Sequence, residues 1–313
     1  SDSSQSGGSE AQERRFSVQA KVTDAFQNPL NNVAVNVNGN SAAVRFLYGT
    51  GTGRAVLRLM QKGRADRLVV GFLKSPLSKP FIRWYAGRHG LRVDKKQLRS
   101  YRSFRDFFAR RRRYLLADMT PQHLISPCDG WLSAFPVDGD SGFEIKGSRY
   151  KLSDLLGDAE LAARFGGGDC LIYRLCPADY HRYCYIDDGY QGDNHYIPGE
   201  LHSVQPAACA KYPVYTLNRR CWTLLATENF GPVVQTAVGA FAVGGIVNER
   251  ENARCRRGDE MGRFELAGST IVQFFEHGRM SLLPEVRTYI ERHGEFRVTQ
   301  GMWVGLGVDK DED

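Results

Sequence analysis

The 313-residue sequence lacks any run of about 18 to 20 apolar residues, the length that an α-helix needs to cross a bilayer. It therefore predicts no transmembrane helix. Its seven cysteines are odd in number and lack paired spacing, which argues against a disulfide framework and for a reducing compartment. Cys170 and Cys176 have no matching Cys or His pair nearby, so we expect no metal site. No internal repeat is found.

Acidic residues are scarce in one long segment. Between Val44 and Arg113 there are 20 Lys and Arg against three acids, a local balance of +17. Because the whole chain carries +7, the remainder must carry −10. A block this basic favours an anionic surface, either membrane lipid or nucleic acid.

The basic segment has a helical pattern, with apolar positions on one side and cations on the other. This pattern is typical of helices that lie in a membrane interface, and equally of packed helices with solvated basic faces. A run of four arginines ends the segment, but no nucleic-acid-binding signature accompanies it, so we expect no nucleic acid partner. The apolar positions are Val56, Leu57, Leu59, Met60, Leu68 to Leu73, Leu77, Phe81, Ile82, Trp84 and Tyr85.

From Ile125 onward the chain is rich in Gly and short strand-like runs. We expect strands at 131–135, 170–173, 233–238 and 271–275, interrupted by one helix from Ser153 to Phe165. The fold class is therefore α+β, with basic N-terminal helices before a mainly antiparallel β domain. The expected division is a partly disordered tail and arm at 1–40, a basic helical membrane-associating region at 41–115, and a β-rich catalytic domain at 116–313.

The tripeptide Gly268-Ser269-Thr270 precedes an apolar, β-branched run. Its simplest interpretation is a Gly-containing turn that enters a strand. A second interpretation makes Ser269 a nucleophile that attacks the unhindered carbonyl of Gly268 and converts the amide to an ester. Elimination would then cut the chain and hydrolysis would leave a pyruvoyl group. The tripeptide alone leaves both interpretations open.

Three other segments carry groups that could take part. Ser126-Pro127-Cys128-Asp129-Gly130 places a carboxylate in a tight turn, although a plain Asp-Gly turn explains it equally well. Asp179-Tyr180-His181-Arg182 places an imidazole between charged residues. The third segment, Ile197-Pro198-Gly199-Glu200-Leu201-His202-Ser203-Val204, follows His195 and contains another histidine.

Taken in order, these segments resemble the phosphatidylserine decarboxylase family. The likeness extends upstream to Phe46-Leu47-Tyr48-Gly49, Ser75-Pro76-Leu77-Ser78 and Ser103-Phe104-Arg105-Asp106-Phe107-Phe108, and so covers roughly residues 40 to 310. Each motif is short, but the ordered set is specific. The resemblance implies a barrel-like or sandwich-like β domain.

The resemblance also implies a mechanism. In the family, an Asp-His-Ser relay drives self-cleavage, and here Asp129, His181 and Ser269 are the corresponding candidates, with cleavage after Gly268. Such a relay is needed because the hydroxyl of a free serine is a poor nucleophile until a base takes its proton. The expected cofactor is a pyruvoyl group formed from Ser269, which acts as an electron sink while CO₂ departs.

One position departs from the family pattern Asp-Tyr-His-Arg-x-His, because Cys184 occupies the place of the second histidine. Either His181 serves both the cleavage and the decarboxylation, or Cys184 acts as a weaker acid and base, or His195 or His202 substitutes. We expect His181 to be the general base and Cys184 to be a packing residue, because an ordinary thiol is an inefficient base at neutral pH.

The expected function is the conversion of phosphatidylserine to phosphatidylethanolamine at a membrane surface that faces the cytoplasm. The expected partners are phosphatidylserine, an anionic membrane, the chain's own two cleavage fragments and, as an option, a second copy. Two alternatives stay open: a pyruvoyl-dependent decarboxylase of a soluble amino acid, and a membrane-associated paralogue that never matures. The basic, aromatic segment favours the lipid, because a soluble amino acid needs no membrane contact.

Overall fold

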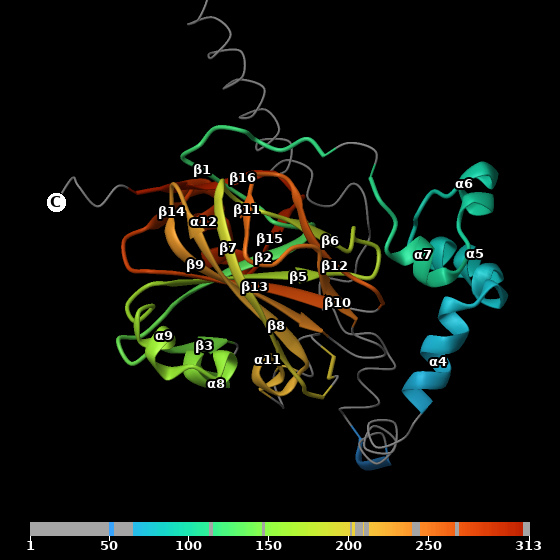
Figure 1. Ribbon diagram of the computed structural model, residues 1–313, viewed down its shortest axis with the longest axis horizontal. Coiled ribbons are helices and arrows are strands. Elements are labelled where there is room, and N and C mark those ends of the chain that lie inside the picture. The colour runs from blue at the N-terminus through green and yellow to red at the C-terminus, as the bar shows by residue number, and fades with distance from the viewer. Residues whose placement is uncertain are drawn as a thin grey trace, which may run out of the picture. The chain divides into compact units, whose positions relative to one another are not determined.

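The chain folds around an eight-stranded antiparallel sheet in the computed structural model of the protein (Figure 1). The structure describes residues 50–52, 65–112, 115–145, 148–200, 202–203, 209, 213–239, 245–266 and 269–308. All of these belong to one compact unit, Asn38–Asp313. The predictions for residues 1–40, for the helical segment around Val56 to Met60 and for Gly268 lie outside the described residues.

Short helices occupy the basic segment between residues 65 and 108. Their starts follow from local chemistry, because Asp94 and Gln97 form a capping box and Ser103 accepts a bond from the amide of Asp106. None of the described helices is both long and apolar enough to span a bilayer. The elements are α4 (Ala65–Lys74), the 3₁₀ helix η1 (Pro76–Ser78), α5 (Lys79–Arg88), α6 (Lys95–Ser100) and α7 (Phe104–Phe108).

The large sheet has the order β11-β7-β8-β9-β13-β5-β2-β15, and every neighbouring pair is antiparallel. The four strands expected from the sequence are all present, and they lie next to one another as β9, β13, β5 and β2. The strands are β2 (Gly130–Pro136), β5 (Asp169–Leu175), β7 (Gly189–Ile197), β8 (Arg220–Thr227), β9 (Gly231–Gly239), β11 (Ala253–Cys255), β13 (Ser269–Phe275) and β15 (Phe296–Val298).

Three smaller sheets surround the large one. They have the orders β1-β16-β14, β10-β12-β6 and β3-β4, again with antiparallel pairs. Short helices α8, α9, α11 and α12 complete the described elements of this part. The bounds are β1 (His123–Ile125), β3 (Gly142–Ile145), β4 (Ser148–Lys151), α8 (Leu152–Leu156), α9 (Ala159–Ala163), β6 (Arg182–Cys184), α11 (Val214–Leu217), β10 (Ile246–Asn248), β12 (Glu260–Phe264), β14 (Met280–Leu282), α12 (Pro284–His293) and β16 (Trp303–Gly307).

The α+β class is confirmed, but two details differ from expectation. The single helix expected from Ser153 to Phe165 is wrong, because Gly157 takes a left-handed conformation at φ 69° and ends α8. Asp158 then caps the separate helix α9. The barrel expectation also fails for the described strands, since the edge strands β11 and β15 each pair with one neighbour and the sheet stays open.

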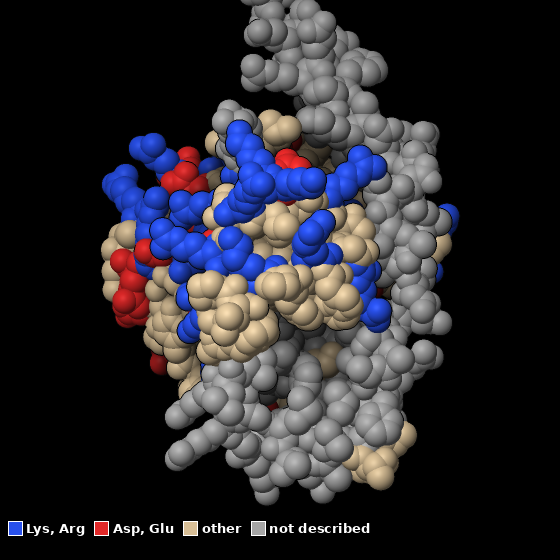
Figure 2. All heavy atoms as spheres, turned by 90° about the vertical axis from the view of Figure 1, so that its right-hand side faces the viewer, with Lys and Arg blue, Asp and Glu red and all other residues tan. Residues whose placement is uncertain are grey.

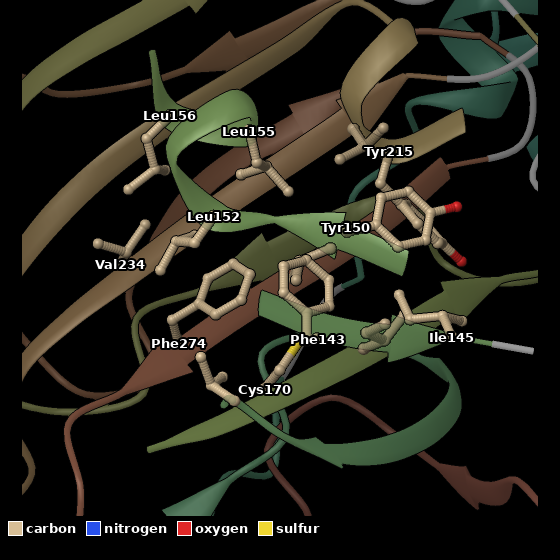
Figure 3. Packing of buried hydrophobic residues seen from close by; sticks show 14 of the residues in the cluster. Phe143, Ile145, Tyr150, Leu152, Leu155, Leu156, Cys170, Tyr215, Val234 and Phe274 are labelled. Carbon is tan, nitrogen blue, oxygen red and sulfur yellow. The ribbon is translucent and has the colours of Figure 1, made fainter. Parts of the chain in front are cut away.

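The main hydrophobic core lies against one face of the large sheet (Figure 3). Phe274 of β13 and Cys170 of β5 meet Phe143 of the β3-β4 hairpin there. Side chains alternate along a strand, and β13 pairs regularly with both neighbours. The side chain of Ser269 therefore lies on the face opposite to Phe274, away from this core.

A second core joins the basic helices to the β domain. Ile82 and Ala86 of α5 pack with three phenylalanines of α7 and with Leu266. Each fully buried phenylalanine stabilises such a cluster by about 1.5–3 kcal/mol. Since Leu266 lies three residues before Ser269, this packing brings α7 close to the start of β13.

Candidate active site

Ser269 begins β13, the strand that lies between β9 and β5. Its backbone is paired with Gly239 of β9 and Leu175 of β5, and only 1% of the residue is exposed. The β-branched and aromatic run that follows favours an extended, buried strand. The hydroxyl is thus held in a fixed place from which bulk water is excluded.

His181 brings a base to this hydroxyl. Its Nδ1 lies 3.3 Å from Ser269 Oγ, and the side chain is fully buried. The His181 carbonyl accepts a 2.8 Å bond from the amide of Phe264, which ties the residue to β12. On the other side the ring of Phe108 stacks on the imidazole with centroids 4.0 Å apart. The structure therefore brings together the two residues that the sequence assigns to proton transfer.

The surroundings of His181 favour a neutral imidazole. Burial lowers the pKa of His181 to about 4; the negative charge of Asp179 opposes this shift, whereas the positive charge of Arg110 adds to it. At neutral pH the ring then has one nitrogen free to accept a proton. Its Nε2 is buried and has no hydrogen-bond partner among the described residues.

Asp129 lies close to these residues but is bound elsewhere. Arg112 contacts both of its carboxylate oxygens, with Nη1 3.0 Å from Oδ1. The amides of Gln300 and Tyr180 donate to the same carboxylate at 2.9 and 3.3 Å. None of the hydrogen bonds between described residues joins Asp129 to the His181 ring. The carboxylate instead holds the backbone of Tyr180, the residue directly before His181.

The sequence interpretation missed the arginines that pair with acidic residues around the site. Arg112 belongs to the run of four arginines that ends the basic segment, to which we assigned no role in the site, yet it also lies over the Tyr180 ring at 4.4 Å. Arg297 holds Asp179 through both carboxylate oxygens. Neither residue stands in a motif, and the partners are more than 15 positions apart, so only the fold could reveal these pairs.

Cys184 lies on β6 and is fully buried. Burial raises the pKa of Cys184 to about 12, so the thiol keeps its proton at neutral pH. Its Sγ lies 4.0 Å from the carbonyl oxygen of Ser126. These surroundings support a packing role rather than a base.

The other two histidines have different neighbours. His195 is exposed on β7 and stacks on Trp222 with centroids 3.8 Å apart. His202 is buried and its Nε2 lies 2.5 Å from Glu200 Oε2. Of the three histidines considered, His181 is the one with a hydrogen bond to Ser269.

Replacing Cys184 by alanine should leave both self-cleavage and decarboxylation within about twofold of the unchanged protein, at a stability cost of roughly 1 kcal/mol. The reason is that a protonated, packed thiol contributes volume and no charge. Fragment appearance on denaturing gels and CO₂ release should be scored separately. A severe loss in Cys184→Ala, together with recovery in Cys184→His, would assign the proton transfer to position 184.

Comparisons with known proteins identify the family of the chain. The sequence pattern of the family described as phosphatidylserine decarboxylase matches residues 103–301. The phosphatidylserine decarboxylase proenzyme 2 of Clostridium acetobutylicum is 34% identical over 289 residues, which cover 90% of this chain and 97% of that protein. A phosphatidylserine decarboxylase proenzyme of Ruminiclostridium cellulolyticum is 34% identical over 272 residues, covering 84% of this chain and 91% of that one. With a match across most of its length and a paired serine and histidine at the expected strand, this chain belongs to the phosphatidylserine decarboxylase family.

Proposed function

We propose that this chain is a self-processing phosphatidylserine decarboxylase that forms phosphatidylethanolamine and CO₂. The observation that carries the proposal is the 3.3 Å contact between His181 Nδ1 and Ser269 Oγ at the start of β13. A buried serine beside a neutral imidazole is the pair of groups that an attack on the preceding carbonyl requires. Family membership supplies the substrate class.

The proposed cleavage begins when His181 accepts the hydroxyl proton of Ser269. The Oγ then bonds to the carbonyl carbon of Gly268, the peptide C–N bond breaks, and the amine of residue 269 takes a proton. Loss of the Cα proton expels the ester oxygen as the carboxylate of Gly268, which leaves a carbon–carbon double bond at residue 269. After tautomerisation, water replaces the nitrogen with oxygen and ammonia leaves. The products are chains 1–268 and 269–313.

The site fits the group that this sequence of steps would form. Ser269 is buried between two paired strands, so a small carbonyl group there would be shielded from water. A pyruvoyl group supplies an electrophilic ketone that draws electrons from the bond to a departing carboxylate. The Nε2 of His181 has no hydrogen-bond partner among the described residues and is therefore available to bond to a polar group of the substrate. We assign Asp129 a positioning role, because it holds the backbone before His181.

Borohydride reduction in the presence of short-chain phosphatidylserine should attach the substrate covalently to the 45-residue fragment 269–313. The reason is that the reactive carbonyl is made from Ser269, so no pyridoxal phosphate is needed. Peptide mapping by mass spectrometry is the measurement. Label on a lysine of fragment 1–268, or a requirement for added pyridoxal phosphate, would contradict the proposal.

The basic helices offer a surface for membrane contact. Figure 2 shows Lys and Arg side chains gathered on the face that carries α5 to α7. Large apolar side chains are exposed among them, with Leu77 78%, Trp84 57% and Phe72 48% accessible. Leu73, in contrast, packs against the inner cluster of α5 and α7. The helices thus have a packed inner side and an outer side on which cations alternate with apolar groups.

We propose that residues 41–115 dock on an anionic membrane and that residues 116–313 catalyse the reaction. Exposed cations near an anionic bilayer contribute about 1 kcal/mol each, and exposed Leu and Trp side chains enter its interface. The seven free cysteines support a membrane face toward a reducing compartment. The exposed cations between residues 70 and 105, on the helices and in their connecting loops, are Lys74, Arg83, Arg88, Arg92, Lys95, Lys96, Arg99 and Arg102.

Binding to liposomes that contain anionic lipid should weaken by about tenfold or more when salt is raised from low to high ionic strength, because the Debye length shortens from ~30 Å at 0.01 M to ~3 Å at 1 M. Cosedimentation measures this. Trp84→Ala should lower the part of the binding that survives high salt. The variant removes an exposed apolar side chain and leaves the buried core residue Ile82 in place. Equal binding to neutral and anionic vesicles would contradict the electrostatic contribution.

A further inference from the structure

Arg110 differs from the neighbouring arginines on and after α7 in having no acidic partner. Arg105 pairs with Glu265 and Arg112 with Asp129, while the more exposed Arg111 lies 3.5 Å from Glu260. No ion pair between described residues includes Arg110, although it is the partly buried member of the run. Burying a guanidinium without an anion is costly, so an unpaired one is a candidate for a ligand contact.

The surroundings of Arg110 leave its donors largely unused. Its guanidinium carbon lies 5.0 Å above the Phe107 ring, and its Nη1 makes a long 3.4 Å bond to the Phe107 carbonyl. Burial lowers the pKa of Arg110, and the phenols of Tyr85 and Tyr101 oppose this shift. The charge of Asp129 also acts on Arg110. That carboxylate, however, is already bound by Arg112 and two backbone amides.

The backbone at Arg110 is fixed next to the catalytic pair. Arg182, the residue after His181, donates to the carbonyls of Ala109 and Arg110 at 2.9 and 3.2 Å. Phe108, two residues before Arg110, stacks on the His181 ring. The charge of Arg110 is one of the groups that act on the pKa of His181. The unpaired guanidinium therefore lies on the side of His181 that faces the basic helices.

We propose that Arg110 binds the phosphodiester of the phosphatidylserine headgroup and so places the serine moiety at residue 269. The inference rests on the proposed function and adds a residue that recognises the substrate. A guanidinium can donate two parallel bonds to phosphate oxygens, and the phosphodiester keeps its charge throughout the reaction. The substrate carboxylate is a poorer partner, because a guanidinium on it would stabilise the charge that must be lost as CO₂.

The test uses purified, self-cleaved enzyme and dihexanoyl phosphatidylserine kept below its micelle concentration, so that membrane docking does not contribute. Arg110→Gln should raise KM by about tenfold to a hundredfold, the range for a lost charged hydrogen-bond pair, with kcat changed by less than about threefold. The KM of Arg110→Lys should lie between that of the unchanged enzyme and that of Arg110→Gln. Arg149→Gln serves as the matched control, because Arg149 is exposed and pairs with Asp138 and Asp140 on a distant hairpin.

A second arm uses an O-alkyl serine, which has the amine and carboxylate of the substrate but no phosphate. With this compound, Arg110→Gln should have the same KM and kcat as the unchanged enzyme. An unchanged KM for the phospholipid, a loss confined to kcat, or an equal loss on both compounds would overturn the inference, as would failure of both Arg110 variants to cleave themselves. An unchanged enzyme that neither cleaves itself nor releases CO₂ would instead contradict the proposed function.

Discussion

Replacing Ser269 by alanine should leave a single uncut chain of 313 residues and no decarboxylase activity. Alanine lacks the oxygen that must bond to the Gly268 carbonyl, and it cannot become a pyruvoyl group. The cleavage rate should fall by roughly 10⁴-fold or more, as in other sites that lose their nucleophile. Denaturing electrophoresis with mass analysis is the measurement. The fold should persist, because alanine fits a buried strand position.

Ser281→Ala is the matched control for this variant. Ser281 lies on the short strand β14, and its hydroxyl makes two long hydrogen bonds: it donates to the carbonyl of Leu282 at 3.3 Å and accepts from Arg287 Nη2 at 3.3 Å. It should cleave and turn over substrate like the unchanged chain. Two fragments with unaltered masses in Ser269→Ala would move the cut to another bond and remove the basis of the mechanism.

Replacing His181 by alanine should slow self-cleavage by about 10²- to 10⁴-fold, the usual contribution of a positioned general base. The pH dependence gives a second test, since a group with a pKa of about 4 stays neutral from pH 8 down to about pH 5. Cleavage by the unchanged chain should therefore be nearly constant over that range and fall as the pH drops through 4. Both the rate of the His181→Ala variant and the pH dependence of the unchanged chain can be measured by rapid mixing into buffers followed by timed gels.

The same shift affects stability. The folded-state pKa of His181 is lower than its ordinary value of 6.5, so the folded state favours the neutral ring. This preference contributes roughly 3 kcal/mol to the free energy of unfolding. The contribution is complete above pH 6.5 and is lost as the pH falls toward 4. A cleavage rate that instead halves near pH 6.5, or a silent His181→Ala variant, would show that another group takes the proton of Ser269.

The sequence was sufficient to predict the strands that hold the site and two of its residues. The β-branched run after Ser269 predicted β13, and the resemblance to the decarboxylase family implied the pairing of Ser269 with His181. The first prediction follows from strand periodicity, whereas the second depends on an ordered set of short motifs that indicates the family. The helix expected from Ser153 failed because Gly157 stops it, which apolar spacing does not indicate.

The electrostatic arrangement of the site could not be predicted in this way. We expected Asp129 to orient His181 directly, whereas the structure places Arg112 on that carboxylate. Which arginine of a run pairs with which acid depends on the angle at which α7 packs on the β domain. That angle is set by Phe104, Phe107 and Phe108 together with Leu266, which is distant in sequence. The unpaired state of Arg110 follows from the same packing.

The most direct test of this account is the intact mass of the purified, unmodified chain under denaturing conditions. Self-cleavage after Gly268 should yield two species, a fragment of residues 1–268 ending in a free carboxylate and a fragment of residues 269–313. The smaller fragment should begin with a pyruvoyl group, and so lack a free amino terminus. A single species with the mass of all 313 residues, from protein that is folded and has been given time to mature, would contradict it.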